Sequence, residues 1–337
     1  LGPCTVTLDA GQYAQIALCT GRGGIGLVPQ LRIAPAAFLG SWCACKLRVQ
    51  QITRKIVVEE TEMAGALDDI DTAYPEMPCL EHIMEAHAEL SERAAHSGHP
   101  DVLPPLNVLE SAPLKAQRAF SKIIHGSHER LLFDLSAPSV RDMARIRSTS
   151  GFMASAWMHA LPSIALFRIE NEEMTVALRL RLGLPIPRLA GSYLCQCQAP
   201  LDPFGHHSLT CRNGYHRSLR HDRIASTIRD MLRALSHVAR DTGLDGYLPL
   251  SASGAKLVLD VYGSGGGPHA ASVGIDVAVT HPCAASYVAA AAREALGCAA
   301  LREGFKVGKY RPACSTVGIQ FVPAVFETFG SCGAQFE

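Results

Sequence analysis

The sequence lacks the features that would place the chain in or across a membrane. No uncharged apolar run reaches the roughly 18–20 residues that a membrane-spanning helix needs. The nearest run, from Cys283 to Ala300, is interrupted by Arg293 and Glu294. No basic-then-apolar leader opens the chain, which gives no support for secretion, and the first residue is Leu1 instead of Met. We therefore expect a fragment of a longer nuclear or other intracellular product with no membrane partner.

The sequence also lacks net charge, with 31 basic and 31 acidic side chains, but this balance hides two opposite segments. Val58–Asp101 holds twelve acids and one arginine, which we interpret as a solvated helix or linker. Arg179–Arg240 holds ten arginines and three aspartates. Because a guanidinium group binds phosphate oxygens bidentately, the second segment suits nucleic acid. An ordinary solvated helix face is the alternative.

No fixed-period repeat or long low-complexity tract is present, and the composition is that of a globular protein. The 337 residues are 48% hydrophobic and 18% charged, which is enough for about two domains with a real core. Twelve cysteines without a secretory context predict reduced thiols and a metal site, and argue against a disulfide framework.

The hydrophobic pattern predicts an α+β protein. Residues 1–190 form a mainly helical part, with helical periodicity over residues 28–55 and a helix from an Asn171 cap to Gly183. A Cys/His-rich loop follows within 191–214. Residues 215–330 then predict a small α/β domain with a mixed sheet. Its expected elements are a helix with apolar positions from Ile224 to Val238 that closes near Gly243, strands Lys256–Tyr262 and Val273–Thr280 joined by the Gly263–Gly267 loop, a helix over Ala284–Glu303, and a strand Val317–Val322 that stops at Pro323.

The Cys/His-rich loop carries a candidate metal site. Cys195, Cys197 and Cys211 lie within 17 residues of one another, together with the pair His206 and His207. Three thiolates and one imidazole satisfy tetrahedral Zn²⁺, and we favour His207 as the fourth ligand. The single residue between the first two cysteines is tighter than the usual two to four, so reduced thiols without metal are the alternative.

The two expected strands each carry one acid. In the first strand, Leu257, Leu259 and Val261 face one way and Asp260 the other. In the second, Asp276 lies opposite Ile275, Val277 and Val279. A hairpin in the right register brings both carboxylates to one face. Like charges at ~4 Å repel by roughly 4 kcal/mol, so the pair would bind Mg²⁺ or Mn²⁺. Two separate solvated carboxylates are the alternative.

The flanking helices add basic groups to this pair of acids. Arg220 and His221 lie on the buried side of their helix, and Lys306, Lys309 and Tyr310 share a face if their segment is helical. Two acids, a divalent metal and a lysine are a set that cleaves phosphodiesters.

These residues together resemble the C-terminal part of reverse-transcriptase polyproteins from early-branching, site-specific non-LTR retrotransposons. The resemblance runs from about residue 15 to 330, with little contribution from residues 50–135. The matching pieces occur in the family's order: GGIGL (Gly23–Leu27), APAAFLGSW (Ala34–Trp42), LRLRLGLP (Leu178–Pro185), CQC with DPFGHHSLTC (Cys195–Cys211), RHDRI (Arg220–Ile224), GIDVAVTHP (Gly274–Pro282), KVGKY (Lys306–Tyr310) and FVPAVFETFG (Phe321–Gly330).

The resemblance implies a thumb-like helical region over residues 1–190, a zinc knuckle over 191–214 and a restriction-like endonuclease domain over 215–330. It implies a structural zinc ion and a catalytic magnesium or manganese ion, with DNA as the partner and RNA as a second candidate. It also implies that the domain nicks target DNA, whose 3′ end then primes reverse transcription. By resemblance, the knuckle ligands are Cys195, Cys197, His207 and Cys211, and the nuclease residues are Arg220, His221, Asp260, Asp276, Lys306, Lys309 and Tyr310.

The sequence departs from the family at several positions. Asp222 stands where the family has Asn, Leu259 replaces the Pro before the first acid, and the Gly263–Gly267 loop looks like an insertion. The polymerase's Asp-Asp motif is not recognisable, since Asp68-Asp69 lies in a polar acidic loop, so we expect no polymerase activity. A non-catalytic nucleic-acid-binding module and a decayed, inactive copy are the alternatives to an endonuclease.

Overall fold

The computed structural model describes most of the chain, and the residues divide into two compact units. The first unit comprises residues 1–19 and 25–135, and the second comprises residues 20–24 and 136–337. The described residues are 7–61, 78–97, 103, 116–137, 139–161, 163, 168–189, 193–213, 215–235, 238–241, 248–251, 254–264 and 272–336. The Asp68-Asp69 pair, residues 62–77 and 98–101 of the acidic segment and most of the Gly263–Gly267 loop lie outside them. The division at Leu135 differs from the expected boundaries after residues 190 and 214, which stay predictions.

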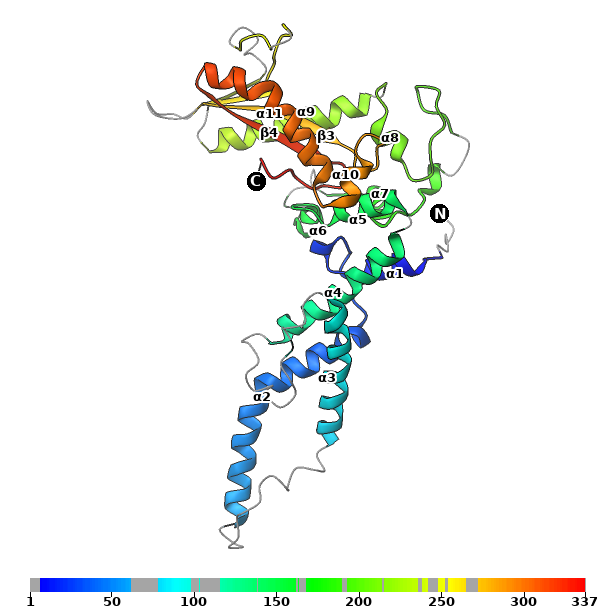
Figure 1. The fold of residues 1–337 in the computed structure, drawn as a ribbon, viewed down its shortest axis with the longest axis vertical. Helices are drawn as coiled ribbons and strands as arrows, with labels where there is room; N and C mark the ends of the chain where they lie inside the picture. Colours follow the sequence, from blue (N-terminus) through cyan, green and yellow to red (C-terminus); the bar gives the residue numbers. More distant parts are fainter. Residues whose placement is uncertain are drawn as a thin grey trace. The chain divides into compact units, whose positions relative to one another are not determined.

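The first unit is helical, as expected for this part of the chain (Figure 1). Its helices are α1 (Ala10–Ala17), α2 (Gln30–Thr61), α3 (Pro78–Ser97) and α4 (Ala116–Ser136). A buried cluster joins α2, α3 and α4, with Leu39, Leu90, Phe120, Ile123 and Ile124 fully buried. None of the described helices is long and apolar enough to span a membrane.

The second unit begins with helices and ends in an α/β layer. Its elements in chain order are η1 (Thr20–Arg22), α5 (Val140–Thr149), α6 (Ala156–His159), α7 (Asn171–Leu182), η5 (Pro187–Leu189), α8 (His206–Thr210), α9 (Tyr215–Ala234), β1 (Val238–Asp241), β2 (Val261–Ser264), β3 (Ser272–Thr280), α10 (Val288–Arg293), α11 (Gly297–Thr316) and β4 (Ile319–Glu327). The α+β class and the mixed sheet are therefore confirmed.

The sheet has the order β1-β2-β3-β4. β1 pairs antiparallel with β2, β2 pairs antiparallel with β3, and β3 pairs parallel with β4. α9 packs on one face through Ala225 and Ile228, which contact a cluster that includes Ile275. α11 packs on the other face through Tyr310 and Cys314, and Figure 1 shows it in orange running along β4. The alternating side chains of β3 therefore meet different helices.

Two predicted helices are corrected by tertiary contacts. The helix expected to close near Gly243 ends at Ala234, because Val238–Asp241 pairs through its backbone with β2. The helix expected over Ala284–Glu303 is two helices, α10 and α11, separated at Leu296, whose φ is 62°. α11 then extends to Thr316, so Lys306, Lys309 and Tyr310 do lie on one helix. A short periodic segment does not decide between helix and strand until a neighbouring strand is present.

The last strand does not stop at Pro323, contrary to the prediction. β4 continues to Glu327, with Pro323 opposite Asp276 in the register. Proline lacks an N–H donor and is tolerated on an edge strand, where one side of the backbone has no neighbour. β4 is such an edge strand in the described sheet.

The first predicted strand is also shorter than expected. Only Val261–Ser264 forms a ladder, although Leu257 and Leu259 are buried. Leu257 and Leu259 pack on the α11 side, whereas Val261 packs on the α9 side. The expected regular alternation over these residues is therefore wrong, because the backbone changes face at Asp260.

The predicted end of α7 is right and its predicted start is shifted by one residue. The N-cap residue is Glu170 instead of Asn171, and its N–H donates to the Glu173 carboxylate at 3.3 Å. Gly183 ends the helix with φ 67°, a conformation that glycine adopts without steric cost.

Candidate functional site

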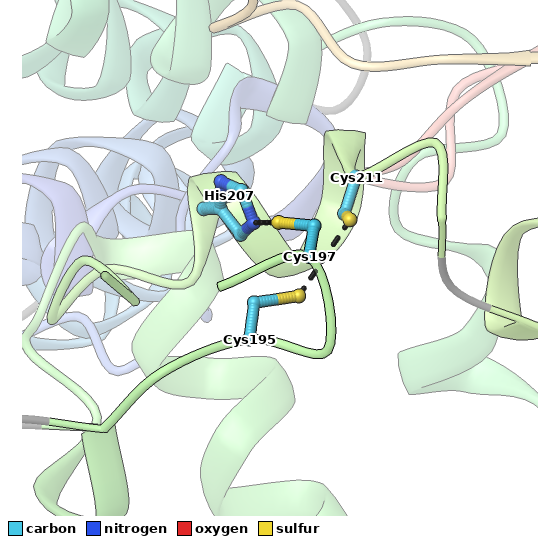
Figure 2. A group of neighbouring side chains, drawn as sticks. All are labelled: Cys195, Cys197, His207 and Cys211. Carbon is cyan, nitrogen blue, oxygen red and sulfur yellow. Dashed lines mark hydrogen bonds between the residues drawn. The ribbon is translucent and has the colours of Figure 1, made fainter. Parts of the chain in front are cut away.

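Four metal-ligating side chains, which we name the Cys3His group, meet around α8. They are Cys195, Cys197, His207 and Cys211, and Figure 2 shows them facing one another. The Sγ atoms of Cys195 and Cys211 are 3.6 Å apart, and Cys197 Sγ lies 3.2 Å from His207 Nε2. All four ligand atoms lie within 4.8 Å of one another. The Cys/His-rich loop is therefore a group that can hold a metal ion.

Local hydrogen bonds build this group from a short segment. Leu194 bridges Pro200, and the Cys195 N–H donates to Ala199 O at 2.9 Å, so the first two cysteines lie in a tight turn. Asp202 accepts hydrogen bonds from the backbone N–H groups of His206 at 3.1 Å and His207 at 2.6 Å. Burial opposes ionisation of Asp202, but these N–H groups hold its pKa below the ordinary value. The turn and the capped helix place the ligands without a large core.

The donor chemistry and spacing of the group fit a tetrahedral ion. Zn–S bonds of about 2.3 Å and Zn–N bonds of about 2.0 Å at tetrahedral angles place ligand atoms about 3.5–3.8 Å apart. The pKa of Cys195 is lowered to about 6, first by the backbone N–H of Cys197 and also by the His207 and Cys211 side chains. A thiol with such a pKa is mostly thiolate at neutral pH, which is the form that binds metal.

Asp260 immediately precedes β2 and replaces part of the ladder. Its N–H donates to Ile275 O at 3.0 Å, and its carboxylate accepts the Val277 N–H at 2.6 Å. The ladder between β2 and β3 begins at the pair Val261 and Ile275. The Asp260 carboxylate therefore takes the hydrogen bond that a longer β2 would have accepted through its backbone.

His221 of α9 reaches the same carboxylate. Its Nε2 lies 3.2 Å from an Asp260 oxygen, and its Nδ1 lies 3.0 Å from Asp222. The hydrogen bond to Asp260 is the main reason why the pKa of His221 is raised to about 9, with Asp222 adding to it and burial opposing it. At neutral pH the imidazole is therefore a cation beside Asp260.

Asp276 projects from β3 to the opposite side, toward α11. It is 4% exposed and forms an ion pair with Lys306, which is 8% exposed. Burial raises the pKa of Asp276, and the Asp260 charge adds to this, whereas Lys306 and Tyr310 oppose it. The two carboxylates therefore lie close enough to repel each other, but they pair with helices on different sides of the sheet instead of emerging on one face, because the regular alternation fails at Asp260.

The remaining α11 residues surround this ion pair. Tyr310 is buried, stacks on Phe321 with ring centroids 5.3 Å apart and hydrogen-bonds to Asp276. Burial is the main cause of the raised pKa of the Tyr310 hydroxyl, and the Asp276 charge adds to it. Lys309 is exposed, and its ammonium donates to the Tyr310 hydroxyl at 3.2 Å. Of the two lysines, Lys306 contacts an acid directly and Lys309 does so through the tyrosine.

The carboxylates of Asp260 and Asp276 suit a hard divalent ion, but they supply only two of the ligands that such an ion needs. Mg²⁺ is commonly held by one or two carboxylates and several waters, and Asp260 and Asp276 supply two carboxylates. Among the described residues, neither acid belongs to a group of three metal-ligating side chains within 4.8 Å of one another. The protein alone therefore offers two ligands here, in contrast to the four of the Cys3His group.

Arg220 is the predicted nuclease residue that the structure places elsewhere. Its guanidinium donates to Leu209 O in α8 at 2.9 Å, so it joins α9 to the Cys3His group. The neighbouring His221 contacts the acid Asp260. Adjacent residues on a helix point in different directions, which explains why the Arg-His pair divides between two sites.

The sequence interpretation missed a second group of metal-ligating side chains. His206, His281 and Cys283 have ligand atoms within 4.8 Å of one another. His206 is 75 positions away from His281 in the chain. No local spacing connects them, since the sheet and α8 bring them together.

Comparisons with known proteins identify no relative of this chain. No family model matches the chain, and no curated protein shows significant similarity to it.

Proposed function

We propose that this chain is a metal-dependent DNA endonuclease that nicks a target strand, as part of a retrotransposon polyprotein. The observation that carries the proposal is that Asp260, just before β2, pairs with His221, while Asp276 of β3 pairs with Lys306 and lies near enough for the Asp260 charge to raise its pKa. Paired carboxylates beside a buried lysine on a small mixed sheet are the expected apparatus for phosphodiester cleavage. The resemblance described above supports the same assignment.

The chain's own residues would divide the work of hydrolysis. Water oxygen bonds to phosphorus, the bond to the 3′ oxygen breaks, and that oxygen gains a proton, which leaves a 3′-hydroxyl and a 5′-phosphate. Lys306 and His221 supply positive charge where negative charge develops on the phosphate. Mg²⁺ or Mn²⁺ bound by Asp260 and Asp276 would add Lewis-acid charge at the same phosphate. Tyr310 orients Asp276 and Lys309.

We assign the Cys3His group to a structural zinc ion. Thiolate and imidazole ligands favour zinc over magnesium or calcium, and four protein ligands leave no open position for chemistry. Three thiolates and one dication carry a net charge of −1, so the ion itself would repel phosphate. The exposed arginines nearby, including Arg212 and Arg217, would attract it.

Nicking of supercoiled plasmid tests the proposal. With Mg²⁺ or Mn²⁺, we expect the chain to convert supercoiled DNA to the open circular form. Asp276→Asn and Asp260→Asn should each slow nicking on the order of 100-fold or more. Asp230→Asn is the matched control, since Asp230 is an exposed acid of α9 that pairs with Arg233. Nicking that survives both site variants would end the assignment.

A nucleic-acid-binding module without catalysis is the second candidate. Arg217 and Arg223 of α9 are exposed and can contact phosphate. Lys306 already neutralises Asp276, which weakens Asp276 as a ligand for a catalytic metal ion. This candidate predicts binding that Asp276→Asn leaves intact and that weakens with salt. Arg217→Ala or Arg223→Ala should each reduce the salt slope by about 1. Binding without nicking in all metals would favour this module or a decayed copy.

A further inference from the structure

His206, His281 and Cys283, which we name the His2Cys group, form one of the two metal-competent clusters among the described residues. His206 Nδ1 lies 3.0 Å from His281 Nε2, and the Cys283 sulfur lies within 4.8 Å of both rings' ligand atoms. The group contains no residue of the Cys3His group or of the Asp260–Asp276 site. It therefore needs an explanation of its own.

The sheet holds His281 in an orientation that suits a ligand. His281 follows the last residue of β3, and its Nδ1 lies 2.7 Å from the Thr328 hydroxyl, just after β4. The Thr328 N–H donates to Thr280 O at 2.9 Å, which fixes the two strand ends together. With Nδ1 committed to Thr328, Nε2 points at His206. Metal-ligating histidines are typically oriented by such a hydrogen bond on the other ring nitrogen.

The other two ligands are also fixed in place. His206 begins α8, where its backbone N–H donates to Asp202. The adjacent His207 points into the Cys3His group, so α8 presents one histidine to each cluster. Cys283 is 4% exposed, and its thiol donates weakly to Arg141 O at 3.5 Å. Two of the three side chains are therefore buried, and each has a separate support.

The local charges do not exclude a cation. Arg141, Arg145 and Arg220 lie near His206 or His281, and Asp202 and Asp142 offset part of their charge. Binding of an ion through the Cys283 thiolate would release the thiol proton to solvent and reduce the added charge to +1. Without an ion, the His206 and His281 rings are joined only by the hydrogen bond between Nδ1 and Nε2, and the Cys283 thiol makes no hydrogen bond to either ring.

We propose that His206, His281 and Cys283 bind a second Zn²⁺ ion, which links α8 to the ends of β3 and β4. Two imidazoles and one thiolate are zinc ligands, and three protein ligands leave a fourth position for a small ligand such as water. This ion would hold the Cys3His segment against the sheet that carries Asp276. Its role is to position two elements of the second unit, independently of whether the chain cleaves DNA.

Metal stoichiometry tests this proposal on the purified chain. After loading with Zn²⁺ and removal of unbound metal, elemental analysis should find two zinc ions per chain. Cys283→Ala and His281→Ala should each reduce this to one, and Cys197→Ala should also leave one. Cys298→Ala is the matched control, because Cys298 is a buried thiol of the same core cluster that lies outside both groups, and it should retain two.

Cobalt absorption distinguishes the two groups even where a variant binds less metal. Co²⁺ in the Cys3His group should give strong thiolate charge-transfer bands, and the His2Cys group should add a weaker band from a single thiolate. Cys283→Ala should remove only the weaker band, and the retained strong bands would show that the neighbouring segment is folded. One zinc ion in the unaltered chain, or two that persist in both Cys283→Ala and His281→Ala, would overturn the proposal.

Discussion

The ion pair between Asp276 and Lys306 has little access to solvent, so each charge depends on the other. Removing one partner of a buried pair leaves an uncompensated charge and typically costs about 3–5 kcal/mol. We expect Lys306→Met to lower the free energy of unfolding by about this amount, measured by urea denaturation. The double variant with Asp276→Asn should recover most of the loss. A loss that is equal in the single and double variants would contradict this reading of the pair.

His128 makes the stability of the first unit depend on pH. Burial, with Arg32 and Arg93 nearby, lowers the pKa of His128 to about 4. A lowered pKa means that the unfolded state binds the proton more tightly, so stability is full above about pH 6.5 and falls as the pH falls toward 4. We expect about 2 kcal/mol less stability at pH 5 than at pH 7, measured by urea unfolding.

Two variants isolate this histidine from the other ionisable groups. His128→Leu should remove the dependence between pH 7 and pH 5, whereas His96→Gln, at an exposed position of α3, should keep it. An unchanged slope in His128→Leu would assign the effect to another group.

At the residue scale, the strand pattern was right for Asp276 and wrong around Asp260, where the backbone changes face. Alternation placed Asp276 opposite Ile275 and Val277, and the α11 side of β3 does carry Asp276. Helical spacing likewise placed Lys306 and Tyr310 together. The direction of Arg220 and the meeting of His206 with His281 could not be predicted, because both depend on where α8 packs. Metal and DNA binding stay predictions.

At the scale of elements, the termination of α7 gives a sharp test. Gly183 has φ 67°, and a Cβ there would lie 2.6 Å from Arg145 Nε. Arg145 is buried and hydrogen-bonded to Asp142 and Arg181 O, so it cannot move away at low cost. We expect Gly183→Ala to destabilise the second unit by about 1–3 kcal/mol, measured by thermal or urea unfolding.

The matched control is a glycine inside a helix. Gly304 lies in α11, and an added Cβ there meets nothing within 4 Å. Gly304→Ala should be neutral or stabilise by about 0.5–1 kcal/mol, because it reduces the freedom of the unfolded chain. Equal destabilisation by both variants would mean that backbone conformation is not the cause at Gly183.

The elements that the sequence mispredicted share a physical reason. The backbone of β1 pairs with β2, and Pro323 is tolerated because β4 has a neighbour on one side only. The Asp260 side chain accepts the Val277 N–H and so ends the ladder, and strand propensity does not predict such a contact. The body of α9 was predictable because its own periodic pattern decides it, whereas its end was not. Segments of four to nine residues are decided by the neighbouring strand.

At the scale of the whole molecule, the two compact units should respond separately to metal removal. Both metal-competent groups belong to the second unit. Structural zinc contributes on the order of 10 kcal/mol to the folding of such segments. We expect calorimetry to show two transitions, and excess chelator should lower the midpoint of one of them only.

Two perturbations assign these transitions. At pH 5, His128→Leu should raise the midpoint of the transition that belongs to the first unit and leave the other in place, and Cys197→Ala should make the other insensitive to chelator. A single transition, or a chelator effect on both, would contradict independent unfolding of the units.

The parallel pairing of β3 with β4 has a consequence for synthesis. The two strands are separated in the chain by α10 and α11, and β4 ends at Glu327. Glu327 accepts hydrogen bonds from Ser331 Oγ at 3.0 Å and the Ala299 N–H at 2.9 Å. Lys306 and β4 leave the ribosome well after Asp276, so a nascent chain carries the acid before its cation and its partner strand. Any nuclease activity would therefore begin only after β4 has been synthesised.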